Sequence, residues 1–200
     1  MRVLVVARTQ MFGPHVCVGG VELATGRSLR LKRLDGSNAL ESHPIRPGSI
    51  WEMAYTPCPS VVPPHVEDVL VSGGHWVEDV ADMRSAILVS WQPWDCPLDE
   101  IFEGRLDATD GGSGFLPAGP VLPSCSTGFW LSRQRATIDS FGRYRFENAR
   151  LIKGVKWKGT TAPAQTIPPG ALIRFSLAKW KEFSPEEGER CYLQLSAWYP

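Results

Sequence analysis

The chain has 200 residues, of which 43% are hydrophobic, and its 21 basic and 21 acidic residues give no net charge. This composition allows a buried core and excludes an intrinsically disordered chain, and no apolar run is long enough to cross a bilayer. The five cysteines form no CxxC pair, which argues against a zinc finger and predicts reduced thiols in a cytoplasmic protein without a bound metal.

The N-terminal part predicts a series of strands. Arg2–Arg8 is a continuous apolar run, as expected for a strand buried on both faces. His15–Leu23 follows a Gly-Pro break, and in Ser28–Arg33 leucines alternate with basic residues, which indicates a half-buried strand. Ser49–Thr56 begins after a Pro-Gly pair and completes this part.

The middle of the chain is predicted to contain an edge strand, two helices and a linker or loop. His65–Val71 is predicted to be an edge strand, because it follows a proline-rich connection. Apolar residues near helical spacing predict a helix over Trp76–Trp91, and a second short helix over Leu98–Glu103. Residues 107–128 are rich in glycine and proline and are interpreted as a linker or a long surface loop.

The C-terminal part returns to strand patterns. About five strands are predicted there, a number that can close a small barrel. They cover Phe129–Ile138, Arg143–Phe146, Leu151–Trp157, Ala171–Leu177 and Cys191–Trp198. The residue patterns therefore predict a mainly β protein with two small barrels and one or two short helices.

Four stretches of the sequence resemble the dual OB-fold (DuOB) domain family of bacterial proteins. They are Val3–Arg8 with Cys17–Gly20 and Gly26–Leu31, then Pro64–Asp68, then Arg133–Phe146, and finally Leu172–Leu177 with Cys191–Leu195. The likeness spans nearly the whole chain, although each motif is short, and the segment 107–128 departs from the family pattern.

The resemblance implies two OB-like barrels and an association with nucleic acid in a prokaryotic defence or mobile-element system. The first OB-like half would span residues 1–106, with the helix near 76–91. The second would span residues 129–200, with 107–128 between the halves as linker or loop. Because fold does not fix function, the functional part of this implication is an inference from the fold.

Charge is unevenly distributed along the chain. Residues 65–110 carry eleven acidic residues against two basic ones, and residues 130–158 carry eight basic residues against two acidic ones. Such asymmetry can steer a polyanion or fit a partner of opposite charge. Alternatively, the two segments neutralise each other within the fold.

An aromatic and basic surface in the second half is the first candidate site. Nine residues there interleave rings with cations: Trp130, Arg133, Arg135, Arg143, Tyr144, Arg145, Lys156, Trp157 and Lys158. OB barrels bind single strands with this mixture, because bases stack on rings while cations follow the phosphates. A basic strand with Arg27, Arg30, Lys32 and Arg33 could extend the track. In the alternative interpretation the tryptophans are core residues and the arginines form a solvated strand face.

A short polar motif, His65-x-Glu67-Asp68, is the second candidate. Its imidazole and carboxylates could bind a metal or transfer protons, or they could hold a loop by hydrogen bonds. On a strand Asp68 would point away from the other two. The chain contains no GxxxxGK[ST], HExxH, GxSxG or GxGxxG motif, so we predict no catalytic residue and no cofactor.

Three hypotheses follow for the function. The first is an accessory module that binds single-stranded or structured nucleic acid through the second half. The second is a subunit of a multi-protein complex that uses the acidic region 65–110 as a protein interface. The third is an enzyme built around His65, Glu67 and Asp68. None of the three involves a membrane.

Overall fold

The computed structural model describes residues 1–182, 184 and 186–200, and within them it confirms the prediction of a mainly β protein. The described residues fall into two compact units. The first unit comprises Met1–Val61 and Glu67–Gln92, and the second comprises Val62–Val66 and Pro93–Pro200.

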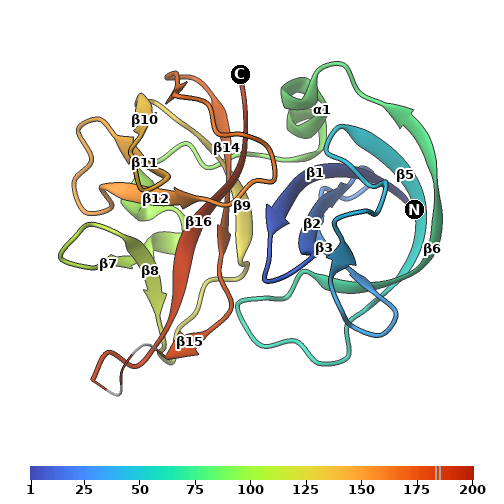
Figure 1. The fold of residues 1–200 in the computed structure, drawn as a ribbon, viewed down its shortest axis with the longest axis horizontal. Coiled ribbons are helices and arrows are strands. Elements are labelled where there is room, and N and C mark those ends of the chain that lie inside the picture. The colour runs from blue at the N-terminus through green and yellow to red at the C-terminus, as the bar shows by residue number, and fades with distance from the viewer. Residues whose placement is uncertain (183, 185) are drawn as a thin grey trace. The chain divides into compact units, whose positions relative to one another are not determined.

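The first unit is a closed barrel of five strands with one short additional strand. Its elements are β1 (Arg2–Gln10), β2 (His15–Glu22), β3 (Ser28–Arg33), β4 (Ala39–Leu40), β5 (Ser49–Pro57), β6 (Asp68–Asp79) and the helix α1 (Met83–Ser90). The order around the barrel is β1-β5-β6-β3-β2, and β1 also pairs with β2, which closes the ring (Figure 1). All neighbours are antiparallel except β3 and β6, which run parallel.

Apolar residues that alternate along the strands fill the interior of this barrel. Val3 and Val5 of β1, Val18 of β2 and Leu29 of β3 are at most 1% exposed. The side chain of Val3 on β1 packs over Gly20 of β2, where an added Cβ would lie 2.6 Å from a methyl carbon of Val3. This contact accounts for glycine at position 20 of an otherwise apolar strand.

The predicted helix over 76–91 is only partly correct. Residues 76–79 continue β6, because their backbone pairs with β5 from Ser49↔Asp79 onward. The helix α1 begins at Met83, after Asp82, whose carboxylate accepts a hydrogen bond from the Ser85 backbone nitrogen at 3.1 Å. Tertiary pairing along β5 outweighs the weak helical spacing of the apolar residues in this stretch.

The second unit contains most of the short strands. Its elements are the 3₁₀ turns η1 (Leu98–Glu100) and η2 (Phe102–Gly104), and the strands β7 (Asp107–Ala108), β8 (Gly114–Pro117), β9 (Thr127–Leu131), β10 (Ala136–Ile138), β11 (Arg143–Phe146), β12 (Gly154–Trp157), β13 (Thr166–Ile167), β14 (Leu172–Leu177), β15 (Lys181–Glu182) and β16 (Glu189–Tyr199). The main path of hydrogen-bonded strands is β13-β10-β11-β12-β16-β14-β9.

This path repeats the connectivity of the first unit. The strands β10, β11 and β12 form an antiparallel meander, β12 pairs in parallel with β16, and β16 returns through β14 to β9. The short strand β13 pairs with β10 at one end of the path. Apart from β13, the path runs from β10 to β9, which are consecutive strands along the chain. In both units a meander is therefore joined to a later hairpin by one parallel pair.

Residues 107–128 are more structured than the predicted linker. They contain β7 and β8, and β8 pairs with β16, where Leu116 lies opposite Cys191. Phe115 and Leu116 are buried, so this segment contributes to the core of the second unit. The glycines permit turns and close packing here: Gly112 has a φ of +76°, and an added Cβ at Gly114 would lie 3.0 Å from Ile152.

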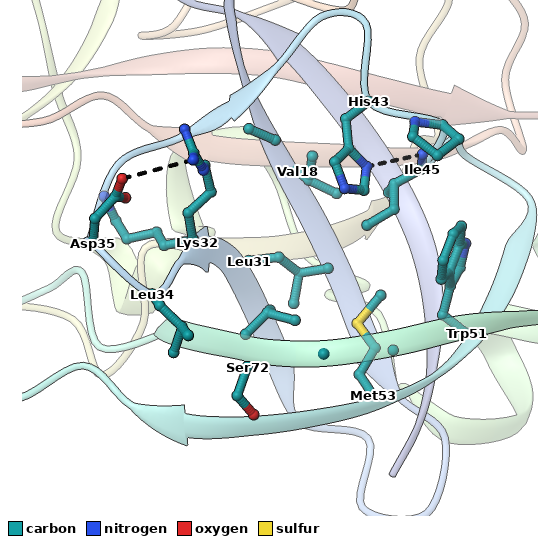
Figure 2. Close-up of a pocket in the computed structure, with 16 residues that line it drawn as sticks. Val18, Leu31, Lys32, Leu34, Asp35, His43, Ile45, Trp51, Met53 and Ser72 are labelled. Atoms are coloured by element: carbon teal, nitrogen blue, oxygen red, sulfur yellow. Dashed lines mark hydrogen bonds and ion pairs between the residues drawn. The ribbon is translucent and has the colours of Figure 1, made fainter.

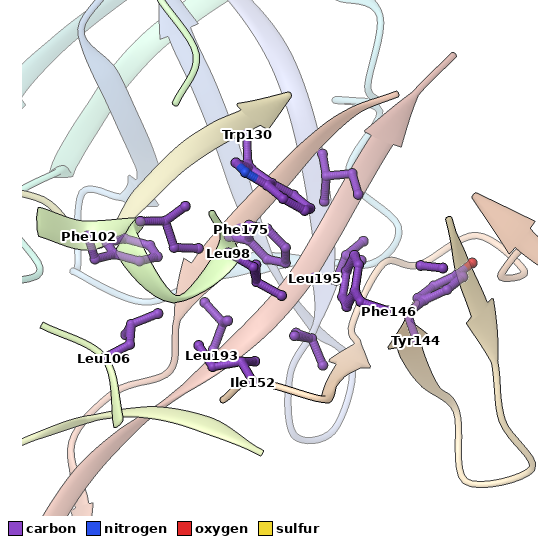
Figure 3. Packing of buried hydrophobic residues seen from close by; sticks show 14 of the residues in the cluster. Leu98, Phe102, Leu106, Trp130, Tyr144, Phe146, Ile152, Phe175, Leu193 and Leu195 are labelled. Carbon is purple, nitrogen blue, oxygen red and sulfur yellow. The ribbon is translucent and has the colours of Figure 1, made fainter. Parts of the chain in front are cut away.

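An aromatic-rich core fills the second unit (Figure 3). The rings of Trp130, Phe146 and Phe175 contact one another, with centroids 5.7 to 6.3 Å apart. The 3₁₀ turns add Leu98 and Phe102 to this cluster, which places residues 93–106 with the second unit rather than with the first half.

Candidate functional site

A cavity of about 750 Å³ lies in the second unit, where β11, β12, β15 and β16 meet the turn between β7 and β8. Six of its lining side chains are cationic: Arg143, Lys156, Lys158, Lys179, Lys181 and Arg190. None of the described lining residues is acidic, and the others are glycine, hydroxyl, amide, apolar or aromatic. We call this the basic cavity. A concave surface lined by one sign of charge concentrates ligands of the opposite sign.

The strand register places like charges directly opposite each other in the basic cavity. Arg143 of β11 pairs with Lys156 of β12, and Lys181 of β15 pairs with Arg190 of β16. In antiparallel strands such partners share a face, so their charges repel and destabilise the sheet. Arg190 has the carboxylate of Glu187 beside it, so the Arg143–Lys156 pair is the one that selection for stability alone would avoid. This pair favours a functional reason.

Three of these cations lack a compensating carboxylate within the described residues. Arg143 donates to the hydroxyl of Ser113 at 3.3 Å, and the Lys156 ammonium donates to the backbone oxygen of Phe141. Lys158 is held by its backbone nitrogen, which donates to Leu195 at 2.9 Å. Their charges are therefore available to an anionic ligand.

Arg190 is fixed in place more firmly than the others. Its guanidinium carbon lies 4.3 Å from the centroid of the Phe115 ring, and its Nη1 lies 3.1 Å from a carboxylate oxygen of Glu187. A hydrogen bond with the Tyr192 side chain raises the pKa of Arg190. This arginine forms a permanently charged wall of the cavity.

Two of the ring residues predicted to contact nucleic acid are core residues instead. Trp130 is 2% exposed, and its indole nitrogen donates to the Cys96 carbonyl at 2.8 Å. Tyr144 is fully buried, and its hydroxyl donates to the Ala164 carbonyl at 2.8 Å. Trp157 is half-buried with its ring edge-on to Tyr144. None of the three lines the basic cavity. Strand alternation turns Tyr144 and Trp157 away from their cavity-lining neighbours Arg143 and Lys156, and β9, which carries Trp130, contributes no residue to the lining.

The predicted arginines divide between the cavity and ordinary ion pairs. Arg133 lies 2.7 Å from Asp95, Arg135 lies 3.7 Å from Glu147, and Arg145 lies 2.8 Å from Asp139. These three do not line the basic cavity. Only Arg143, Lys156 and Lys158 of the predicted surface do so, and they are the ones without a carboxylate partner in the described chain.

Arg30 and Lys32 belong to a buried ion-pair cluster in the first unit. Arg30 is 7% exposed, and its Nη1 lies 2.9 Å from Asp68, while the Lys32 ammonium lies 3.8 Å from the other oxygen of that carboxylate. Burial opposes the charge of Arg30, but Cys17, Asp68 and Glu67 outweigh it and raise its pKa. Arg30 is therefore structural, which corrects its prediction as a nucleic-acid contact.

The polar motif does not assemble as one site. Asp68 belongs to this ion-pair cluster, and Glu67 is 3% exposed in the first unit. His65 belongs to the second unit, is fully buried, and lies 3.6 Å from the Cys191 sulfur. Among the described residues no group of three or more His, Cys, Asp or Glu side chains could hold a metal ion.

A second cavity, of about 600 Å³, opens into the barrel of the first unit (Figure 2). Its floor is apolar and includes Val18, Leu31 and Met53, with Trp51 to one side. Its polar rim is internally bonded: Arg33 lies 3.9 Å from Asp35, and His43 accepts from the backbone of the second residue after it at 3.3 Å. Burial and the nearby Arg8 and Arg33 lower the pKa of His43.

Comparisons with protein-family models, with curated proteins and with solved structures found no match to this chain. No helix among the described residues combines the length and the apolar character that crossing a membrane requires. The candidate site consequently depends on the geometry of the cavities alone. Sequence reasoning missed Phe141, Lys179, Lys181 and Arg190, which lie outside the predicted surface or on a turn.

Proposed function

We propose that this chain is an accessory module that binds nucleic acid through the basic cavity. The proposal rests on three cations that line the cavity, Arg143, Lys156 and Lys158. None of the three has a carboxylate partner among the described residues, and Arg143 and Lys156 face each other across the strands. Phosphates of a bound strand would relieve the repulsion within the pair and release their own counterions. Binding would thus offset a destabilisation that the free protein carries.

We infer that each unit is an OB-type barrel. The support comes from the shared connectivity, a meander joined to a hairpin by the parallel pairs β3–β6 and β12–β16. OB barrels commonly bind oligonucleotides on their strand faces and connecting loops. The resemblance to dual OB-fold proteins leads to the same proposal, with a prokaryotic defence or mobile-element system as its setting. The five free cysteines support a cytoplasmic location.

A protein interface on the acidic region 65–110 is the second candidate. Several of its carboxylates already form ion pairs within their own unit: Asp68 with Arg30, Glu78 with Arg2, Asp79 with Arg46, and Asp95 with Arg133. Carboxylates in these pairs are already neutralised by arginines and attract a basic partner less. A stable complex captured through this region in the absence of nucleic acid would favour this candidate.

The parallel strand pairs suggest a specific test of the nucleic-acid proposal. In the first unit, Arg30 of β3 faces Asp68 of β6; in the second, Lys156 of β12 faces the neutral Gln194 of β16. The variant Gln194→Glu would place a carboxylate opposite Lys156 without deleting any cation. We expect it to weaken binding of a fluorescent single strand at low salt by tenfold or more, at about 1.4 kcal/mol per factor of ten.

The matched control is Glu147→Gln, which removes a carboxylate from the exposed ion pair with Arg135, outside the cavity. It should leave binding unchanged. If the wild-type protein binds neither single-stranded nor duplex nucleic acid at low ionic strength, the proposed function is wrong.

A further inference from the structure

Phe141 is an exposed aromatic side chain at the rim of the basic cavity. It lies in the turn between β10 and β11, lines the cavity and is 72% exposed. A phenylalanine that exposes most of its ring contributes little hydrophobic stabilisation to its own fold. Single exposed apolar residues are common, so its significance depends on how the turn holds it and on what surrounds it.

The turn that carries Phe141 is held by hydrogen bonds on both sides. One oxygen of Asp139 accepts from the backbone nitrogens of Phe141 and Arg143, each at 2.9 Å, and the other accepts from Arg145 at 2.8 Å. The carbonyl of Phe141 accepts from the Lys156 ammonium. Gly142 has a φ of +69°, which closes the turn and favours glycine. The backbone from which the ring projects is thus held in place before any ligand binds.

The charge of Asp139 maintains this turn. Its burial disfavours ionisation, but the hydrogen bonds from the Arg143 backbone, the Arg145 side chain and the Phe141 backbone outweigh burial and lower the pKa of the carboxyl. Asp139 does not line the basic cavity, so its negative charge is used within the turn rather than against a ligand.

The turn that carries the ring is connected directly to two cations of the cavity. Lys156 bonds to the backbone of Phe141 itself, and Arg143, two residues along the chain, lies opposite Lys156 across the strands. A nucleotide that places its phosphate beside these two cations brings its base to the rim of the cavity. There the free face of the phenylalanine ring offers a stacking surface.

We propose that Phe141 stacks on an unpaired base and thereby makes the basic cavity selective for single-stranded nucleic acid. This inference rests on the proposed function and specifies its substrate class. In a duplex the bases already stack on one another and are covered by their partners, so the ring gains nothing. A polyanion without bases, such as inorganic polyphosphate, would meet the cations alone.

The first unit provides a matched control. Phe12 lies in the β1–β2 turn, which occupies the same place in the connectivity as the β10–β11 turn, and it is 99% exposed. It is also followed by a glycine with positive φ, Gly13 at +67°. Phe12 lines neither of the two cavities, so its ring has the exposure of Phe141 without the cations.

The test compares Phe141→Ala, Phe141→Tyr and Phe12→Ala on three ligands: a labelled oligothymidine strand, a duplex of equal length, and polyphosphate as a competitor. We expect Phe141→Ala to lose about 5- to 150-fold in affinity for the single strand, the usual effect of removing one stacked base. Its affinity for duplex and polyphosphate should change less than about twofold, on the same reasoning. Phe141→Tyr should keep the wild-type affinity, because its ring stacks equally well, and Phe12→Ala should be unchanged.

The outcomes separate this inference from the proposed function. If Gln194→Glu weakens single-strand binding while Phe141→Ala does not, nucleic-acid binding stands and the stacking role is wrong. If Phe141→Ala weakens the affinity for all three ligands equally, the ring only supports the structure of the cavity, and the inference is wrong. If Phe12→Ala loses as much single-strand affinity as Phe141→Ala, the assignment of stacking to this cavity is wrong. Absence of any nucleic-acid binding by the wild-type protein would overturn the function itself.

Discussion

Neutralising the facing cations of the basic cavity should separate binding from stability. In the double variant Arg143→Gln and Lys156→Gln, both side chains keep their hydrogen-bonding capacity but lose their charge. Because the two cations face each other across β11 and β12, their repulsion disappears with the charge. We expect the free energy of unfolding to stay equal or to rise by about 0.2–1 kcal/mol, while nucleic-acid binding weakens.

The salt dependence of binding shows how much affinity the two cations contribute. Each phosphate contacted on a single strand adds about −0.7 to the slope of log affinity against log salt concentration. If all six cations of the cavity contact phosphates, the wild-type slope is about −4, and loss of two contacts brings it to about −3. Between about 50 and 200 mM salt the affinity then falls about 300-fold for the wild-type protein and about 50-fold for the variant.

Fluorescence anisotropy with a labelled single strand at several salt concentrations measures both slopes, and urea unfolding measures stability. Arg135→Gln is the control, since Arg135 is exposed, lies 3.7 Å from Glu147 and is outside the cavity. An unchanged slope in the double variant, or an equal change in the control, would refute phosphate binding by these cations.

The remaining predictions test the residues that the structure reassigns. Trp130→Ala should cost about 3–5 kcal/mol of stability in urea unfolding, yet leave the affinity of the folded protein unchanged. Asp68→Asn should lower the free energy of unfolding by about 3–5 kcal/mol, because it removes the carboxylate that faces the buried Arg30. The double variant Arg30→Met and Asp68→Leu should lower it far less, because it buries no charge at this place. Since the pKa of Asp139 is lowered in the fold, its stabilisation is complete above the ordinary value of 3.8 and is lost as the pH falls through the lower folded value. Acid unfolding should therefore be steeper in wild type than in Asp139→Asn, and identical profiles would show that this carboxylate does not stabilise the turn.

Strand periodicity predicted most of the fold, because strands buried on one or both faces leave a pattern in the local sequence. Arg2–Arg8 and Ser28–Arg33 lie within β1 and β3 as expected. The helix predicted near 76–91 is partly wrong, because β6 extends to Asp79 through pairing with residues of β5 that lie 25 to 30 positions earlier in the chain. Glycine and proline in 107–128 indicated turns correctly, but composition could not show that the strands between them pair with β16.

The site was harder to predict, since a list of cations does not show which are already paired. Arg145 and Arg143 are two residues apart, yet one bonds to Asp139 and the other faces the cavity. Lys181 and Arg190 enter the site through the β15–β16 pairing, which their separation in sequence conceals. The one available signal was Phe141, an aromatic residue beside a turn glycine, where no core position is expected.

The two units place similar charges in opposite circumstances, and this contrast supports the functional assignment more strongly than the number of cations does. Where β3 and β6 run parallel, Arg30 meets the carboxylate of Asp68 and both are buried. Where β12 and β16 run parallel, Lys156 meets the amide of Gln194 at the wall of an open cavity. A cation with a carboxylate opposite contributes to the fold, whereas one opposite a neutral amide and a second cation destabilises it until an anion binds. The second arrangement is the one expected if a ligand supplies the anion, as we propose.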